Sequence, residues 1–158
     1  MLTKPDTDPT EIPADCHTGP HRVVLDKWID CAPFERLLNM EIKSAENGSA
    51  VLAMPFCRQY AQGAGLMHGG ALVSLADTAV VMAIKSLLEP QSHFATIGME
   101  SKFLYPVKQG TVTARAKVTD RKDRTIRGEA TVYNENEKAV FSFSSVFKIA
   151  KDTKIRGL

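Results

Sequence analysis

MHGGALVSLADTAVVMAI, residues 67–84, is a glycine pair followed by a nearly all-apolar run. Gly69 and Gly70 carry no Cβ, so the backbone there can approach a neighbouring group closely. The first N–H groups of a helix have no acceptor within the helix and lie at the positive end of its dipole. A helix that is apolar on nearly all sides is buried, so the rest of the chain has to cover it.

Asp77 is the single carboxylate in this run, and it follows Gly70 by seven residues. Seven residues make almost two helical turns, so Gly70, Ser74 and Asp77 share one helix face. An unpaired carboxylate in an apolar helix is costly, and it therefore needs a partner or a function. A structural interpretation is a helix–helix hydrogen bond or an ion pair with Lys85. A functional one is acyl hydrolysis, which needs a carboxylate and backbone donors to the carbonyl oxygen.

Apolar and polar residues alternate in six further segments, and period two predicts β-strands. The first two, at 40–44 and 50–54, flank Asn47-Gly48, a hairpin signal. The others follow the helix at 97–103, 112–118, 126–132 and 141–149. Short polar loops between alternating strands indicate an antiparallel sheet. About six strands can bury one long helix only by wrapping around it, so the predicted class is α+β.

The N-terminal part is predicted to add a helical segment before the sheet. From Arg22 to Leu38 the apolar residues fall on one helical face, and Pro33 suits the first position of a second helical turn. Asn39 is a suitable residue to end it, because asparagine accepts the left-handed conformation. Residues 1–20 contain four prolines and are expected to form an extended or flexible arm, with residues 21–158 as a single domain.

Composition narrows the function classes. The chain has 158 residues, 44% hydrophobic and 24% charged, with a net charge of +2 and 7% aromatic residues, which does not indicate nucleic-acid binding. The apolar run at 71–88 is interrupted by polar residues, so a buried helix is expected rather than a membrane span. No signal-peptide core precedes it, so a cytoplasmic location is predicted. Three cysteines without ligand spacing argue against a disulfide framework and against a metal site.

Five short motifs together resemble the hotdog-fold acyl-CoA thioesterases, in the branch typified by the phenylacetic-acid-degradation thioesterase. They are APFERLL at 32–38, GLMHGG at 65–70, LAD at 75–77, TI at 96–97 and FLYPV at 103–107. Gly110 follows before the next strand, as in that family, and the similarity extends over residues 32–149. The resemblance implies a hotdog dimer, usually paired again into a tetramer, with active sites at the dimer interface.

The resemblance also implies residue roles. The Gly69 N–H would polarise the thioester carbonyl, and Asp77 of the partner subunit would be the nucleophile or general base. Thr96 matches a Ser/Thr that hydrogen-bonds near the carboxylate or the attacking water. His68 matches a histidine that has a structural role more than a chemical one. Candidate substrate-binding residues at the helix start and along its face are Gly70 and Ser74.

Gln62 departs from the family pattern, because relatives commonly have asparagine six residues before the histidine. Either the loop is re-spaced to compensate, or the extra methylene limits the rate, since a misplacement of about 1 Å can cost roughly a hundredfold.

A basic cluster at a predicted strand turn has two interpretations. Arg121, Lys122, Arg124 and Arg127 form either a solvated hairpin or a site for the 3′-phosphate and pyrophosphate of coenzyme A.

The preferred interpretation is an acyl-CoA thioesterase without metal or redox cofactor, with sites shared between the subunits of a homodimer. Gly70 and Asp77 lie roughly 10 Å apart along the helix, too far for one thioester carbon to contact both. The alternative is a non-catalytic acyl-CoA-binding or regulatory hotdog protein. A hotdog dehydratase is disfavoured because its histidine–carboxylate motifs are missing. A transcriptional version is disfavoured because residues 1–20 cannot form a helix-turn-helix.

Overall fold

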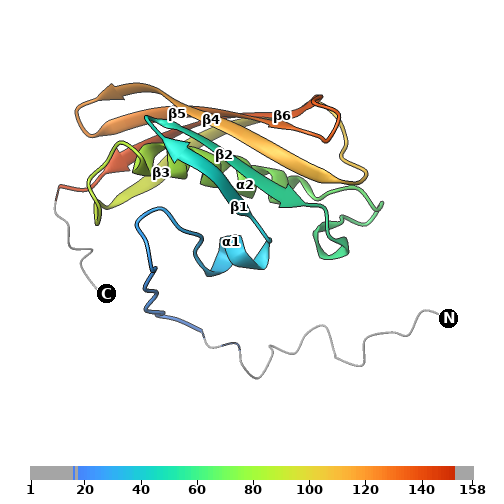
Figure 1. The fold of residues 1–158 in the computed structure, drawn as a ribbon, viewed down its shortest axis with the longest axis horizontal. Helices are drawn as coiled ribbons and strands as arrows, with labels where there is room; N and C mark the ends of the chain where they lie inside the picture. The colour runs from blue at the N-terminus through green and yellow to red at the C-terminus, as the bar shows by residue number, and fades with distance from the viewer. Residues whose placement is uncertain (1–15, 17, 152–158) are drawn as a thin grey trace.

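One antiparallel sheet of six strands wraps around helix α2 (Figure 1). The structure, a computed structural model, describes residue 16 and residues 18–151. The elements in chain order are α1 (Pro33–Leu37), β1 (Glu41–Glu46), β2 (Ser49–Pro55), the 3₁₀ helix η1 (Arg58–Tyr60), α2 (Gly69–Lys85), β3 (Phe94–Phe103), β4 (Thr111–Lys122), β5 (Thr125–Tyr133) and β6 (Ala139–Ile149). The strand order β1-β2-β4-β5-β6-β3 places β1 and β3 at the two edges.

The predicted alternation is confirmed in the central strands. Val112 and Ala114 of β4, and Ala130 and Val132 of β5, are buried against α2 while their neighbours face outward. Asn47 and Gly48 both have positive φ, 50° and 77°, as a tight hairpin between β1 and β2 requires. The α+β class and the arrangement of six strands around a central helix are therefore confirmed.

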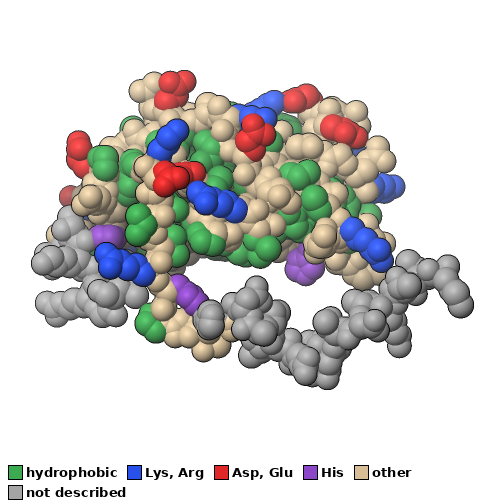
Figure 2. All heavy atoms as spheres, turned by 60° about the horizontal axis from the view of Figure 1, so that its bottom comes forward, with side chains coloured by type: hydrophobic (Ala, Val, Ile, Leu, Met, Phe, Trp, Pro, Cys, Tyr) green, Lys and Arg blue, Asp and Glu red, His purple; other side chains and the backbone are tan. Residues whose placement is uncertain are grey.

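The sheet covers only one side of α2. Apart from Gly69 at its start, the helix residues that stay incompletely buried follow the i, i+3, i+4, i+7 spacing of a single face: Gly70, Val73, Ser74, Asp77, Val81 and Lys85. Figure 2 views the molecule from the side on which α2 lies and shows a broad area of hydrophobic side chains there. Because this stripe contains Asp77, the face that the sheet leaves uncovered is the one with the candidate functional residue.

Gly128 allows β5 to approach α2 closely. A Cβ at this position would clash with Val80 Cγ1 and lie 3.2 Å from the Lys117 carbonyl oxygen. Overpacking of this kind typically costs 1–3 kcal/mol. We expect Gly128→Ala to lower the free energy of unfolding by about 1–3 kcal/mol in urea titrations. Val80→Ala makes room for the new methyl group. The double variant should therefore lose less unfolding free energy than the sum of the losses in the two single variants. Losses that simply add would contradict this packing.

The prediction of a helix over residues 22–32 is wrong. That segment has no helix, and helical structure starts only at Pro33. Trp28 Nε1 donates to the Lys85 carbonyl oxygen at 2.9 Å, and Lys85 Nζ donates to the Trp28 carbonyl oxygen at 2.9 Å. A short isolated helix is marginal, and these contacts hold the segment against the end of α2 instead. Lys85 is therefore engaged with Trp28, not with Asp77 as the structural interpretation supposed.

Other predictions depend on residues that are hardly described. The arm at 1–20 lies largely outside the described residues, as do residues 152–158 of the proposed domain.

Asn39 has φ of 51°, which confirms the left-handed end of the α1 segment. Within the described part of the chain, none of the helices has the length and apolar character needed to cross a membrane.

Candidate active site

The start of α2 presents a free backbone donor at Gly69. His68 caps the helix, because its Nδ1 accepts the Gly70 N–H at 2.9 Å. The Ala71 N–H donates to the His68 carbonyl oxygen at 3.0 Å. Among the described residues the Gly69 N–H has no acceptor, so it remains available at the positive end of the helix. The two glycines therefore differ: the Gly70 N–H is bonded to the His68 cap, and the Gly69 N–H is free for a ligand.

A groove of about 340 Å³ lies beside Gly69. A Cβ at Gly69 would lie 2.9 Å from Phe103 Cε1, so only glycine leaves this approach to the backbone open. The remaining lining is mainly apolar, from Gln62, Leu66, Met67, Leu72, Phe103, Leu104, Tyr105, Pro106 and Val107. No functional role was predicted for the groove residues Leu104 and Tyr105. They could have been noticed in the sequence as apolar residues directly after an alternating strand. In the structure both side chains are about half exposed.

The loop before α2 brings Gln62 to this groove. The Gln62 carbonyl oxygen accepts from Gly65 N, and its side-chain Oε1 accepts from Ala64 N, which fixes the side chain within its own turn. Buried Tyr60 anchors the loop on both sides: its carbonyl oxygen accepts the His68 N–H at 2.7 Å, and its Oη donates to the Leu37 carbonyl oxygen at 2.9 Å. The Gln62 Nε2 has no partner among the described residues and is the part of the amide that a ligand can engage.

Asp77 and Thr96 lie together, as the resemblance implied. Thr96 Oγ1 is 3.3 Å from Asp77 Oδ1 and donates a hydrogen bond to the carboxylate. Burial raises the pKa of Asp77 above its ordinary value, and the hydrogen bond from Thr96 offsets part of that rise. A carboxylate with a raised pKa is better suited to accept a proton near neutral pH than an exposed one. The Ser74 hydroxyl donates to the Gly70 carbonyl oxygen at 2.7 Å, so it is engaged within the helix.

The two halves of the candidate site are apart within one chain. Gln62 and Gly69 line the groove, whereas Asp77 and Thr96 do not. In Figure 1 the loop before α2 lies at the right end of the molecule, and the start of β3 lies at the left end.

The basic turn between β4 and β5 lies at the end of the molecule where β3 starts (Figure 1). Arg124 Nη1 donates to the Ile149 carbonyl oxygen at 3.2 Å, and Ile149 pairs with Phe94, the first residue of β3. Arg121, Lys122 and Arg127 are exposed beside it. The predicted cluster therefore lies near Thr96 and far from the Gly69 groove of its own chain.

The cap predicts how His68 variants behave. Alanine removes the acceptor for the Gly70 N–H, and loss of an N-cap typically costs 0.5–2 kcal/mol. We expect His68→Ala to lose about 1 kcal/mol of unfolding free energy and His68→Asn to lose much less, because asparagine also caps. If the imidazole acts only as a cap, His68→Asn should also retain most of the parent's catalytic turnover. A folded His68→Asn variant without turnover would instead give the imidazole a chemical role.

Comparisons with known proteins show which family this chain belongs to. The thioesterase superfamily matches residues 64–141, which include Gly69, α2 and strands β3 to β5. The acyl-coenzyme A thioesterase PaaI of Escherichia coli is 34% identical over 110 residues, 68% of this chain and 76% of that protein. The chain belongs to the thioesterase superfamily.

Further relatives of this thioesterase-family chain support the assignment to the PaaI-type branch and the hotdog fold. The solved structure of E. coli PaaI has a TM-score of 0.70 at 29% identity, covering 75% of this chain and 85% of that chain. The 1,4-dihydroxy-2-naphthoyl-CoA hydrolase of Listeria monocytogenes is 26% identical over 120 residues, 76% of this chain and 98% of that protein. In the described residues, His, Cys, Asp and Glu form no group of three that could hold a metal ion.

Proposed function

We propose that this chain hydrolyses acyl-CoA thioesters, with each active site formed by two subunits. The observation that carries this proposal is the free Gly69 N–H at the start of α2, combined with the Asp77 carboxylate two turns further on the uncovered face. Both relatives named above are hydrolases of CoA thioesters by name. One chain supplies the donor to the thioester carbonyl, and its partner supplies the carboxylate.

The proposed reaction assigns one task to each group. The thioester carbonyl oxygen accepts the Gly69 N–H, which stabilises the charge that develops there during attack. Asp77 of the partner takes a proton from water, whose oxygen adds to the carbonyl carbon. The carbon–sulfur bond then breaks as Asp77 passes this proton to the sulfur, so coenzyme A leaves as the thiol, the acid is released and Asp77 is again ionised. The Gln62 Nε2 donates to the carbonyl or the water, and Thr96 holds the carboxylate in place.

The uncovered faces support a homodimer. The stripe of α2 with Asp77 is not covered by its own sheet, and β3 is an edge strand beside it. Two copies that meet along this side bring the Asp77–Thr96 end of each toward the Gly69 groove of the other. The exposed Arg121, Lys122 and Arg127 then lie near the shared site, where they bind the phosphates of coenzyme A. Further pairing of dimers into a tetramer is part of the same proposal.

The Thr96 hydrogen bond predicts a shift in the pH profile. Because this bond lowers the pKa of Asp77, Thr96→Val should raise that pKa further. A general base acts when ionised, so the acidic limb of the kcat/KM profile should move to higher pH in Thr96→Val. Thr96→Ser retains the hydroxyl and should keep the parent's profile. An unchanged acidic limb in Thr96→Val would contradict the role of Asp77 as the titrating base.

The function is tested by thiol release. The purified protein is mixed with short, medium, long and aryl acyl-CoAs, and free coenzyme A is followed with a thiol reagent. We expect catalytic release for at least one class of acyl group. Binding of acyl-CoA by calorimetry without thiol release from any class would contradict the proposal and favour the non-catalytic binding protein.

A further inference from the structure

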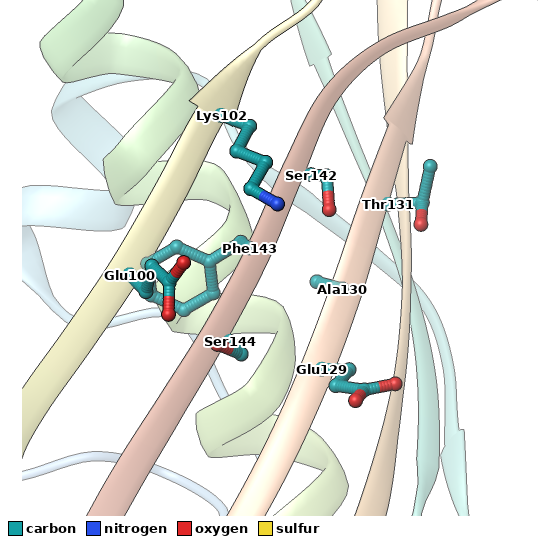
Figure 3. Close-up of a pocket in the computed structure, with 8 residues that line it drawn as sticks. All are labelled: Glu100, Lys102, Glu129, Ala130, Thr131, Ser142, Phe143 and Ser144. Atoms are coloured by element: carbon teal, nitrogen blue, oxygen red, sulfur yellow. The ribbon is translucent and has the colours of Figure 1, made fainter.

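An acyl group bound at Gly69 needs an apolar cavity beside it. The cavity of about 260 Å³ drawn in Figure 3 is polar and lies on the face of the sheet away from α2. Its charged and hydroxyl side chains are Glu100, Lys102, Glu129, Thr131, Ser142 and Ser144. The groove of about 340 Å³ at Gly69 has a mainly apolar lining instead. Under the proposed function, this groove therefore decides which acyl groups are accepted.

The wall of the groove that follows β3 has a fixed backbone. The Leu104 and Tyr105 N–H groups both donate to the Val140 carbonyl oxygen of β6, at 2.9 and 3.2 Å. Further along, the Val107 carbonyl oxygen accepts the Met67 N–H of the opposite wall at 3.0 Å. Since the backbone is held on both sides, the shape of the groove here depends on the side chains of this wall.

The ring of Tyr105 is held by a cation. This side chain is 52% exposed, and among the described residues its hydroxyl has no hydrogen-bond partner. Lys138 Nζ lies 3.3 Å from the centre of the ring, which is a cation–π interaction. A half-exposed ring without a hydrogen bond is otherwise free to change its orientation, so the Lys138 ammonium is the polar contact that fixes it.

The turn between β5 and β6 holds Lys138 ready for this contact. The Asn134 N–H donates to the Lys138 carbonyl oxygen at 3.0 Å, and Asn134 Oδ1 accepts the Lys138 N–H at 3.0 Å. The neighbouring Glu137 is engaged elsewhere, in a 2.7 Å ion pair with Arg115. In the described part of the chain no carboxylate lies within ion-pair distance of Lys138. Its partner is therefore the Tyr105 ring rather than an acid.

We propose that Tyr105 sets the length limit of the acyl group and that Lys138 is the positioning residue that holds its ring in the groove wall. The proposal rests on the proposed function, because the same groove receives the thioester at Gly69. A fixed ring presents the same wall to every acyl group and excludes those that are too long. A ring free to rotate would present several walls and discriminate less.

The chain-length profile tests the role of Tyr105. The ratio of kcat/KM between the longest accepted acyl-CoA and the next longer one in an even-numbered series measures the limit. Leucine is shorter than tyrosine, so Tyr105→Leu should lower this ratio roughly tenfold, within the range that one methylene contributes in an apolar pocket. An unchanged ratio in a folded Tyr105→Leu variant would overturn the length limit.

The role of Lys138 is tested with matched variants. Lys138→Met keeps most of the stem and removes the charge, so it should lower the ratio roughly threefold, the strength of an exposed cation–π contact. Lys138→Arg and Tyr105→Phe retain that contact and should keep the parent's ratio. The control Lys117→Met removes an exposed lysine of β4 that does not line the groove, and it should have no effect.

A double variant shows whether Lys138 acts through Tyr105. In the Tyr105→Leu background the ring is gone, so adding Lys138→Met should leave the ratio nearly unchanged. A threefold change in both backgrounds would overturn the positioning role. The same ratios are measured as Kd values of non-hydrolysable acyl-CoA thioethers by calorimetry. A protein that binds with this selectivity but releases no thiol from acyl-CoA would refute only the proposed function.

Discussion

Asp77→Asn is expected to lower kcat by about a thousandfold or more. Asparagine keeps the shape of the side chain and can still accept the Thr96 hydrogen bond, but it cannot take a proton from water. A positioned general base contributes typically 10²–10⁴-fold, and the loss should fall in the upper part of that range because no other carboxylate lies beside Thr96 in the described residues. Turnover is measured as thiol release at saturating acyl-CoA.

The same variant should be at least as stable as the parent near neutral pH. The folded-state pKa of Asp77 is raised, so the protonated carboxyl is favoured in the fold and its ionised form costs stability. The contribution of Asp77 to stability is fully present below its unfolded pKa and is lost as the pH rises through the folded pKa. Asparagine cannot ionise, so the Tm of Asp77→Asn should exceed that of the parent above that window.

Asp26→Asn is the matched control, because Asp26 is exposed and outside the site. It should leave both kcat and Tm unchanged. Undiminished hydrolysis by Asp77→Asn would contradict the proposed mechanism, even if its Tm rises as expected.

Gly69→Val is expected to lower kcat/KM by about a hundredfold or more. The new side chain would collide with the Phe103 ring, since even a Cβ there lies 2.9 Å from Cε1 and 3.1 Å from Cζ. Either the ring moves into the groove or the valine covers the Gly69 N–H, and the carbonyl loses its donor in both cases. Removal of one oxyanion donor typically costs 10²–10³ in kcat.

The matched control is Gly63→Val in the loop before α2, where a Cβ would meet no atom within 4 Å. It should retain activity within about threefold of the parent, well below the effect of a lost oxyanion donor. Equal losses in the two variants would show that valine acts through the loop rather than through the Gly69 donor. A fully active Gly69→Val would remove the helix start from the mechanism.

The sheet and the central helix could be predicted from sequence because their signals are local. Period two along β4, β5 and β6 reflects burial of one face, and the apolar run of α2 reflects burial among those strands. The segment at 22–32 was not predictable in this way. Its apolar residues fit a helical face, but contacts of Trp28 with Lys85, 57 residues away, hold it in another conformation.

The candidate site was predictable as a set of residues but not as an arrangement. The spacing of Gly69, Gly70 and Asp77 was visible in the sequence. Which of the two glycine N–H groups stays free was not, because it depends on His68 Nδ1 accepting the Gly70 N–H. The Gln62 side chain was expected to reach one methylene too far. Its bond to Ala64 N depends on a turn that composition does not specify.

Subunit mixing tests the shared active site most directly. Asp77→Asn and Gly69→Val, each inactive alone, are unfolded together at equal amounts and refolded. A hybrid dimer then contains one site with both an intact Gly69 and an intact Asp77. Random pairing makes half of the dimers hybrid, so we predict recovery of roughly a quarter of the parent's activity, as expected for an isologous dimer. No recovery in a mixture shown by mass spectrometry to contain hybrids would contradict a site shared between subunits.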